Sequence, residues 1–252
     1  MQKVYILGDS HALRLGHILF DNIINRLNKD QNYFTQHTVE SLRTEKQDQD
    51  GEHLFLRSEL HTISVDDKSM STAAFLGRSA LNFDYSMYGY TSDWNKSSNT
   101  IMPWFGYIDI KNYLPIKTLD NFKNPKQVVE TYVNNVLKNF KNSNIIFIKP
   151  IPQFEVIVSA RWKTFSADPG LEFEVRHSAH IEFCERLEQK CKRHGLQSPI
   201  DISDILGVPW IYSSMQYKKP IQYIYNDHCL PEYYNKILND FIDNKKIISF
   251  GP

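Results

Sequence analysis

The stretch that decides the fold is KVYILGDSHALRLG, residues 3–16. Its apolar run VYIL (residues 4–7) is rich in β-favouring residues and is closed by Gly8, a pattern typical of a buried strand. From Ala12 onward apolar residues recur with helical spacing, at positions 15, 18, 19, 23, 24 and 27, which predicts a helix. Ser10 therefore lies in a predicted strand-to-helix turn.

Two interpretations of Ser10 follow from this placement. A strand-to-helix turn gathers backbone N–H groups at a helix start, where negative charge is favoured. Serine is among the preferred N-cap residues, so the turn alone favours a plain cap. The alternative is a nucleophile whose oxyanion would meet hydrogen-bond donors already in place.

Composition bounds the function. The chain has 252 residues, of which 41% are hydrophobic and 23% charged, as expected of a globular protein with a large core. Lys+Arg and Asp+Glu both number 29, and this balance argues against nucleic acid as the main partner. No apolar run is long enough to span a membrane, and the strand close to the N-terminus leaves no room for a signal peptide. Three cysteines make no disulfide framework, so we expect a cytoplasmic protein.

The alternation of strands and helices predicts one domain over residues 1–252, a three-layer α/β/α fold with a mostly parallel sheet. Helices are predicted at NPKQVVETYVNNVLKNF (124–140), at 172–193 and at PEYYNKILNDFID (231–243). Strands are predicted at HLFLRSELHTISV (53–65) and NIIFIKPIP (144–152). We expect two irregular segments, a polar excursion near 29–53 and an aromatic-rich loop near 82–107.

Three motifs add a catalytic hypothesis. LGDSHA (7–12) places Ser10 after the first strand, FLGRSALN (75–82) contains Gly77, and NDHCLPEYY (226–234) places His228 shortly before the last predicted helix. Here the sequence resembles the SGNH/GDSL hydrolases, serine esterases and acyl-transfer enzymes with a flavodoxin-like α/β/α fold. The resemblance implies Ser10 as nucleophile, His228 as general base, and the N–H groups of Ser10 and Gly77 in an oxyanion hole.

The chemistry explains why such residues occur together. A serine hydroxyl is a weak nucleophile until a base takes its proton, and histidine, with an ordinary pKa of about 6.5, suits that task near neutrality. Preset N–H donors then stabilise the oxyanion, each by roughly 3–4 kcal/mol.

The motif that supplies a third oxyanion donor departs from the family pattern Gly-x-Asn-Asp. The nearest stretch, FGYIDIKN (105–112), has Ile108 in the asparagine position, and isoleucine cannot donate. Asn112, one helical turn further on, is our candidate replacement, and a hole with two donors is the alternative. We assign substrate binding to five residues near these motifs: Asp9, Arg78, Trp104, Tyr107 and Asp109.

The acid partner of His228 is also displaced. The family's acid precedes the histidine by three residues, where this chain has Tyr225, and the adjacent Asp227 is the best remaining candidate. Neighbouring side chains in extended backbone point apart, so Asp227 could reach the imidazole only through a tight turn. A Ser10–His228 dyad oriented by a backbone carbonyl is the alternative. A third interpretation gives His228 no catalytic role and makes it a surface histidine in a loop before a helix.

Two rival sites compete with this assignment. GDSHA approximates the nucleophile elbow of α/β-hydrolases, but that elbow follows several strands and Ser10 follows one. His177, His180 and Cys184 share one face of the long helix, extended by Cys191, and such residues can bind zinc. Core packing is the commoner cause of such a stripe, so we predict no metal and no other cofactor.

The aromatic residues of 82–107 suit the faces of sugar rings, or else they cover the core. We therefore expect ester hydrolysis or acyl (acetyl) transfer through acyl-Ser10. The expected substrate is a small-molecule or glycan ester, most simply an acylated carbohydrate, with an acyl donor as partner if the reaction is transfer. The alternative is a catalytically inert module with the same fold that binds a glycan or a protein.

Overall fold

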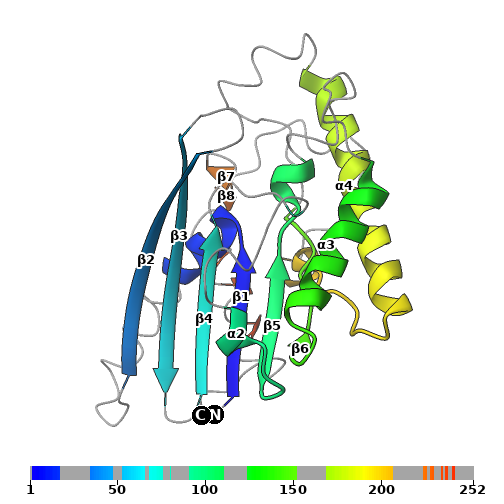
Figure 1. Ribbon diagram of the computed structural model, residues 1–252. Helices are drawn as coiled ribbons and strands as arrows, with labels where there is room; N and C mark the ends of the chain where they lie inside the picture. The colour runs from blue at the N-terminus through cyan, green and yellow to red at the C-terminus, as the bar shows by residue number, and fades with distance from the viewer. Residues whose placement is uncertain are drawn as a thin grey trace.

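The computed structural model describes residues 2–17, 35–47, 53–65, 68–75, 80, 91–110, 124–151, 169–206, 224–225, 228–229, 234, 236–237 and 240–241. Within these ranges six strands form one sheet in the order β2-β3-β4-β1-β5-β6 (Figure 1). Their bounds are β1 Gln2–Gly8, β2 Thr35–Gln47, β3 His53–Val65, β4 Lys68–Phe75, β5 Asn99–Trp104 and β6 Asn144–Ile145.

The parallel part of the sheet has a doubly wound order. β1 pairs in parallel with β4 on one side and with β5 on the other, and β5 pairs in parallel with β6. A parallel bridge between Ile148 and Ile200 continues this series. The first of these strands is therefore central, as in flavodoxin-like sheets. The predicted fold class, α/β with a mostly parallel sheet flanked by helices, is confirmed.

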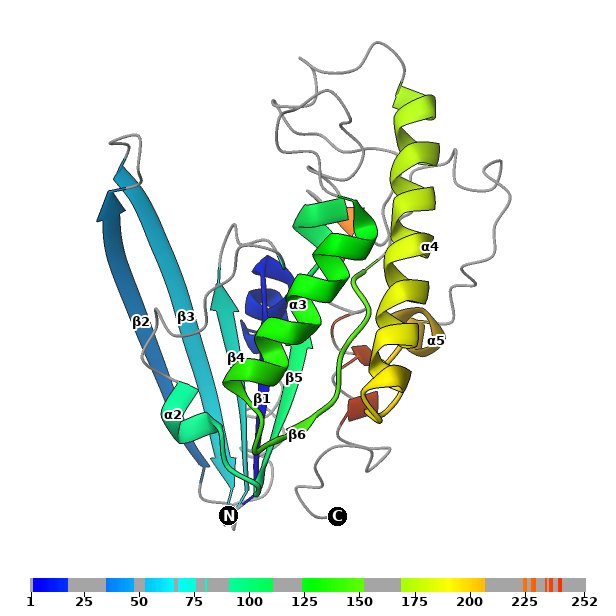
Figure 2. The same cartoon turned by 45° about the vertical axis from the view of Figure 1, so that its right-hand side comes forward.

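Both faces of β1 are buried, which explains its unbroken apolar run. Tyr5 and Leu7 belong to the core cluster that includes α3 (Pro125–Asn139) and α4 (Pro169–Arg193), which cover one face (Figure 2). Successive strand side chains point to opposite faces, so the fully buried Ile6 faces the other way. There the helix over 10–17 packs so closely that a Cβ on Gly16 would overlap Thr72, the partner of Ile6 in β4.

The helices follow the sequence signals. α3 is capped by Asn124, whose side chain accepts a hydrogen bond from Lys126 N at 2.8 Å, and Pro125 stands at the first turn. Beyond α4 the chain turns at Gly195, which has φ +66°. The shorter elements are α2 Thr91–Trp94, α5 Ile202–Leu206, β7 Ile224–Tyr225 and β8 His228–Cys229. Among the described helices, none is both long and apolar enough to cross a membrane.

Two segments expected to be irregular contain strands. The polar excursion near 29–53 includes β2, which pairs antiparallel with β3 over thirteen positions. β2 is at the edge of the sheet, where polar residues are tolerated, and its sequence therefore carries little strand signal. The segment near 82–107 includes β5, which lies between β1 and β6 in the sheet. β5 contains Pro103, and because proline is rare inside central strands the sequence carries no strand signal there.

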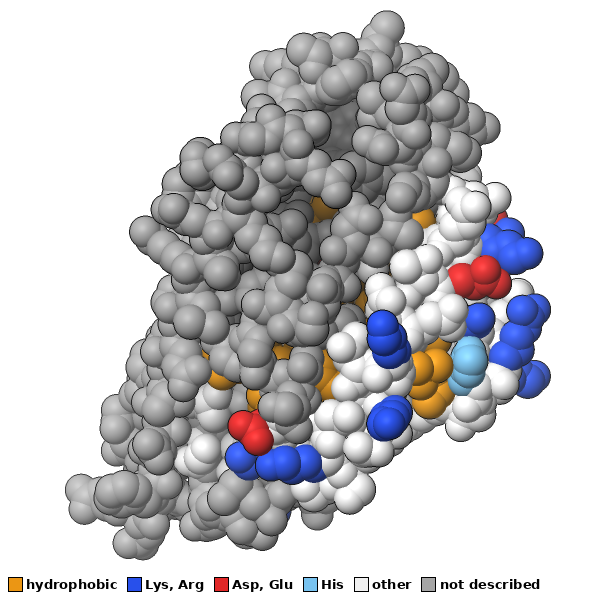
Figure 3. All heavy atoms as spheres, viewed as in Figure 1, with side chains coloured by type: hydrophobic (Ala, Val, Ile, Leu, Met, Phe, Trp, Pro, Cys, Tyr) orange, Lys and Arg blue, Asp and Glu red, His pale blue; other side chains and the backbone are white. Residues whose placement is uncertain are grey.

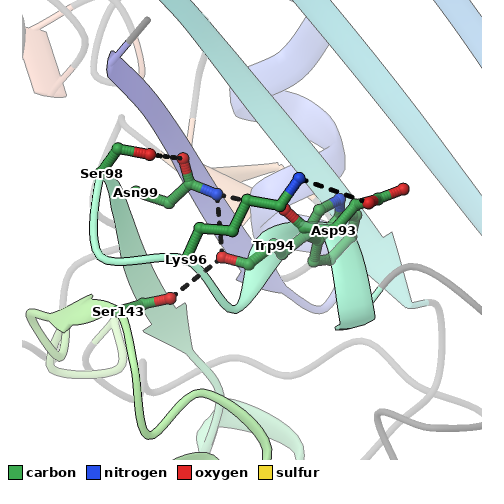
Figure 4. Close-up of polar contacts among 6 residues, drawn as sticks. All are labelled: Asp93, Trp94, Lys96, Ser98, Asn99 and Ser143. Carbon is green, nitrogen blue, oxygen red and sulfur yellow. Dashed lines mark hydrogen bonds and ion pairs between the residues drawn. The ribbon is translucent and has the colours of Figure 1, made fainter.

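The start of β5 is fixed by a polar turn (Figure 4). Asn99 Nδ2 donates to the carbonyl oxygen of Trp94 at 2.9 Å, and Ser143 Oγ donates to the same oxygen at 3.0 Å. The Trp94 ring stacks on Tyr5 of β1 with centroids 4.8 Å apart. These contacts join the start of β5 to β1 and β6. Trp94 therefore lies in the core near the first residue of β5, whereas Gly106 follows its last residue.

Candidate active site

The candidate site lies at the carboxyl ends of β1, β4 and β5. The chain leaves β1 to build the β2-β3-β4 side of the sheet and then returns to β5 on the other side of β1 (Figure 1). Ligands of open α/β sheets bind in the crevice at such a switch point. Residues 9–11 follow β1, residues 105–109 follow β5, and Ala80 follows β4.

Glycine is required at the end of β1. A Cβ on Gly8 would lie 2.7 Å from the carbonyl oxygen of Trp104 and 2.9 Å from Cβ of Ala12. The absence of a side chain therefore lets the helix over 10–17 begin directly against β5. The glycine of the GDS motif thus lets the start of this helix lie against Trp104, the last residue of β5.

Asp9 caps this helix. Its Oδ1 accepts a hydrogen bond from His11 N at 2.9 Å, its carbonyl oxygen accepts one from Leu13 N at 3.3 Å, and the residue is 1% exposed. The interpretation of Ser10 as a plain N-cap is therefore wrong, because Asp9 makes the capping bond. Ser10 occupies the first helical position and is partly exposed. We assigned Asp9 to substrate binding; in the structure its carboxylate is buried and caps the helix.

Asp109 ties two of the loops together. This buried carboxylate accepts a hydrogen bond from Ala80 N at 2.7 Å, joining the segment after β4 to the segment after β5. Gly77 and Arg78 lie outside the described residues, and so does Asn112. The contact holds Ala80, three residues after Gly77 in the sequence, against the turn after β5.

The turn after β5 depends on Gly106. Its φ is +116°, and a Cβ there would lie 2.7 Å from Cζ of Phe183 on α4. Gly106 O accepts the hydrogen bond of Ile110 N at 2.9 Å, which closes the helical turn that contains Asp109. The glycine thus sets the direction of the chain toward Ala80.

His11 is a buried contact point that the sequence did not single out. Its Nδ1 is 2.8 Å from the hydroxyl oxygen of Tyr234. Its ring meets the ring of Tyr107 edge-on with centroids 4.5 Å apart, and the centroid of the Trp104 ring lies 6.0 Å away. Trp104 and Tyr107, which we expected to bind substrate, are 2% and 5% exposed and pack on His11. The available signal was the position of His11, directly after Ser10.

The segment that contains His228 reaches the same end of the sheet. β7 and β8 lie beyond the arrowheads of β1 and β5 in both Figure 1 and Figure 2. Tyr225 pairs antiparallel with His228, and Ile224 with Cys229. The side chain of His228 and the whole of Asp227 lie outside the described residues.

Three of the four residues of the His/Cys stripe on α4, His180, Cys184 and Cys191, are buried, and His177 is partly exposed. His180 Nε2 lies 3.0 Å from the carbonyl oxygen of Pro150, to which it donates, and 3.5 Å from Cys184 Sγ. Burial lowers the pKa of His180 to about 4, raises that of the Cys184 thiol and raises that of Cys191 to about 12. Within the described ranges no three His, Cys, Asp or Glu side chains are grouped so as to hold a metal.

Basic side chains gather on the outer surface of α3 and α4 (Figure 3). A groove of about 160 Å³ between α3 and α4 is lined by Lys126, Val129, Glu130, Arg186, Gln189, Lys190 and Arg193. Arg186 is paired with Glu182 through its Nε at 2.8 Å. This groove is formed by helices that cover the sheet, not by the loops around Ser10.

Comparison with known proteins adds the fold alone. No family model and no curated protein matches the sequence. A solved structure that is similar is LAE5, an alpha/beta hydrolase enzyme from the metagenome of Lake Arreo, Spain. The two chains share 13% identity with a TM-score of 0.52, over 95% of this chain and 93% of that one. The chain has the fold of a known hydrolase.

Proposed function

We propose that this protein is a serine-dependent enzyme of the SGNH/GDSL type, which hydrolyses an ester or transfers an acyl group through an acyl-Ser10 intermediate. The observation that carries the proposal is the position of Ser10. It is partly exposed, it follows the central parallel strand, and it stands first in a helix whose cap is Asp9. Helix starts at such strand ends favour developing negative charge.

Each residue has a defined role in the proposed reaction. Ser10 Oγ attacks the ester carbonyl carbon while His228 takes the hydroxyl proton, and the carbonyl oxygen becomes an oxyanion held by the N–H groups of Ser10 and Gly77, with Asn112 as third donor. The C–O bond to the leaving alcohol then breaks, and the alcohol leaves with the proton from His228. Asp227 orients the imidazole.

Deacylation reverses these roles. Water, or a sugar hydroxyl in the transfer reaction, gives its proton to His228 and attacks the acyl carbon, and the Ser10–acyl bond breaks. The products are a carboxylic acid or a new ester, and Ser10 regains its proton from His228.

An acylated carbohydrate is the proposed substrate, with acetyl as the simplest acyl group. Trp104 and Tyr107 pack on His11, so the support comes from the aromatic residues of positions 83–90. In the sequence this stretch begins three residues after Ala80, whose N–H donates to Asp109 in the turn after β5. Aromatic side chains suit the faces of sugar rings, which is why this stretch of sequence supports a carbohydrate substrate.

The test combines labelling and turnover. The purified protein is treated with a fluorophosphonate probe and assayed with p-nitrophenyl acetate, alongside Ser10→Ala. We expect the wild type to label and to release acetate, and Ser10→Ala to do neither. The rate should fall in acid, because an imidazolium cannot accept the serine proton.

Acceptor sugars and acetyl-CoA added to the same assay separate transfer from hydrolysis, because transfer forms acylated sugar faster than free acetate. A Ser10→Ala protein as active as the wild type would remove Ser10 from the mechanism. A folded wild-type protein that neither labels nor turns over ester would favour the inert binding module instead.

A further inference from the structure

We propose that the contact between His11 and Tyr234 positions the catalytic pair, and that both are positioning residues of the active site. The inference rests on the function proposed above, in which Ser10 and His228 must meet. It concerns how two segments from opposite ends of the chain are held in one geometry.

The contact joins the two catalytic segments close to their reactive residues. His11 directly follows Ser10, and Tyr234 stands six residues after His228. His11 Nδ1 and Tyr234 Oη are 2.8 Å apart although 223 positions separate them in the sequence. The helix that begins with Ser10 is therefore bonded directly to the C-terminal segment.

His11 is a rigid anchor for this bond. Its backbone N–H is held by Asp9, its ring is packed edge-on against Tyr107, and it is 1% exposed. Tyr107 belongs to the turn after β5, whose course Gly106 sets. The imidazole therefore has little freedom to move independently of the strand ends.

The C-terminal segment is packed by an apolar face. Tyr234, Ile237 and Phe241 lie in helical backbone at positions i, i+3 and i+7, and all three are 1% exposed or less. Apolar burial holds the segment against the protein but is not directional. The hydroxyl of Tyr234 adds a directional contact, which fixes how far the segment slides and turns relative to Ser10.

Loss of this bond should act on catalysis more than on folding. Tyr234→Phe keeps the ring and its apolar contacts and removes one buried oxygen. A small displacement of the C-terminal segment would move His228 relative to Ser10 Oγ, and misplacement of a catalytic group by about 1 Å can cost on the order of 100-fold in rate.

The first experiment compares Tyr234→Phe with the wild type in p-nitrophenyl acetate turnover and in the rate of fluorophosphonate labelling. We expect kcat and the labelling rate to fall together by roughly 10- to 100-fold, with KM changed by less than about threefold. Tyr5→Phe is the matched control, since Tyr5 is a buried tyrosine that stacks on Trp94 at the start of β5. It should leave both rates unchanged.

A second set of variants tests whether the two residues act through one bond. His11→Asn keeps a polar group near the position of Nδ1 and should retain most of the activity, whereas His11→Leu should lose as much as Tyr234→Phe. The double variant His11→Leu/Tyr234→Phe should lose no more than the worse single variant, because one interaction cannot be removed twice.

The outcomes separate this inference from the proposed function. If Ser10→Ala abolishes activity but Tyr234→Phe leaves kcat and the labelling rate within about twofold of the wild type, the inference is overturned and the function stands. Single variants that lower Tm but leave kcat unchanged would show a structural role and overturn the inference. Activity losses that add in the double variant would also overturn it, because they would show that the two residues act separately. A wild type without serine-dependent activity removes both.

Discussion

Replacement of Gly106 by alanine should destabilise the protein in two separable ways. The residue has φ +116°, which side-chain-bearing residues rarely adopt, and its new Cβ would lie 2.7 Å from Cζ and 2.9 Å from Cε1 of Phe183. The first effect is backbone strain, worth about 1–3 kcal/mol. The second is overpacking against a fully buried ring, worth about 1–3 kcal/mol more.

Gly195→Ala is the matched control because it has only the first effect. Gly195 has φ +66°, and a Cβ added there would meet no atom within 4 Å. We expect this substitution to lower the free energy of unfolding by about 1–2 kcal/mol. Gly106→Ala should lower it by about 2–6 kcal/mol in total, and the excess over the control contains the clash with Phe183 together with any additional backbone strain at φ +116°.

Urea unfolding followed by circular dichroism measures both variants. For a chain of this size, each kcal/mol corresponds to roughly 2–4 °C in Tm, so the two variants should be distinguishable by heat as well. In the Gly106→Ala background, Phe183→Leu should cost less than it does in the wild type, because it removes the atoms that clash. Equal destabilisation by Gly106→Ala and Gly195→Ala would refute the reasoning.

Two further predictions concern the cap and pH. Asp9→Ala should lower the free energy of unfolding by about 0.5–2 kcal/mol because the hydrogen bond to His11 N is lost, whereas Asp9→Asn keeps an acceptor and should cost less in the same urea titration. Burial lowers the pKa of His180 to about 4 in the folded protein. On acidification the His180 imidazole is therefore protonated near pH 6.5 in the unfolded chain but only near pH 4 in the folded protein. Stability from this group is complete above about pH 6.5 and should fall by roughly 2 kcal/mol by pH 5, at about 1.36 kcal/mol per pKa unit, a loss that His180→Gln should not show.

Part of the fold could be predicted because the signals are local. Apolar runs and helical spacing predict β1, α3 and α4, and all three are present. β2 and β5 escape such prediction for opposite reasons. β2 is polar because it lies at the sheet edge, and β5 contains Pro103 beside aromatic residues, so neither has the pattern of a buried strand.

For the site, the sequence by itself determined the turn after the first strand: a strand, Gly8, Asp9, Ser10 and then a helix, in a chain of α/β class. It did not decide which of Asp9 and Ser10 caps the helix, since both residue types can accept the N–H bond and only the observed bond to Asp9 distinguishes them. It also held no sign that His11 contacts Tyr234 or that Asp109 binds Ala80 N. Contacts between distant segments depend on strand order and on packing across the sheet, which no local pattern contains, so the tertiary structure alone decided them.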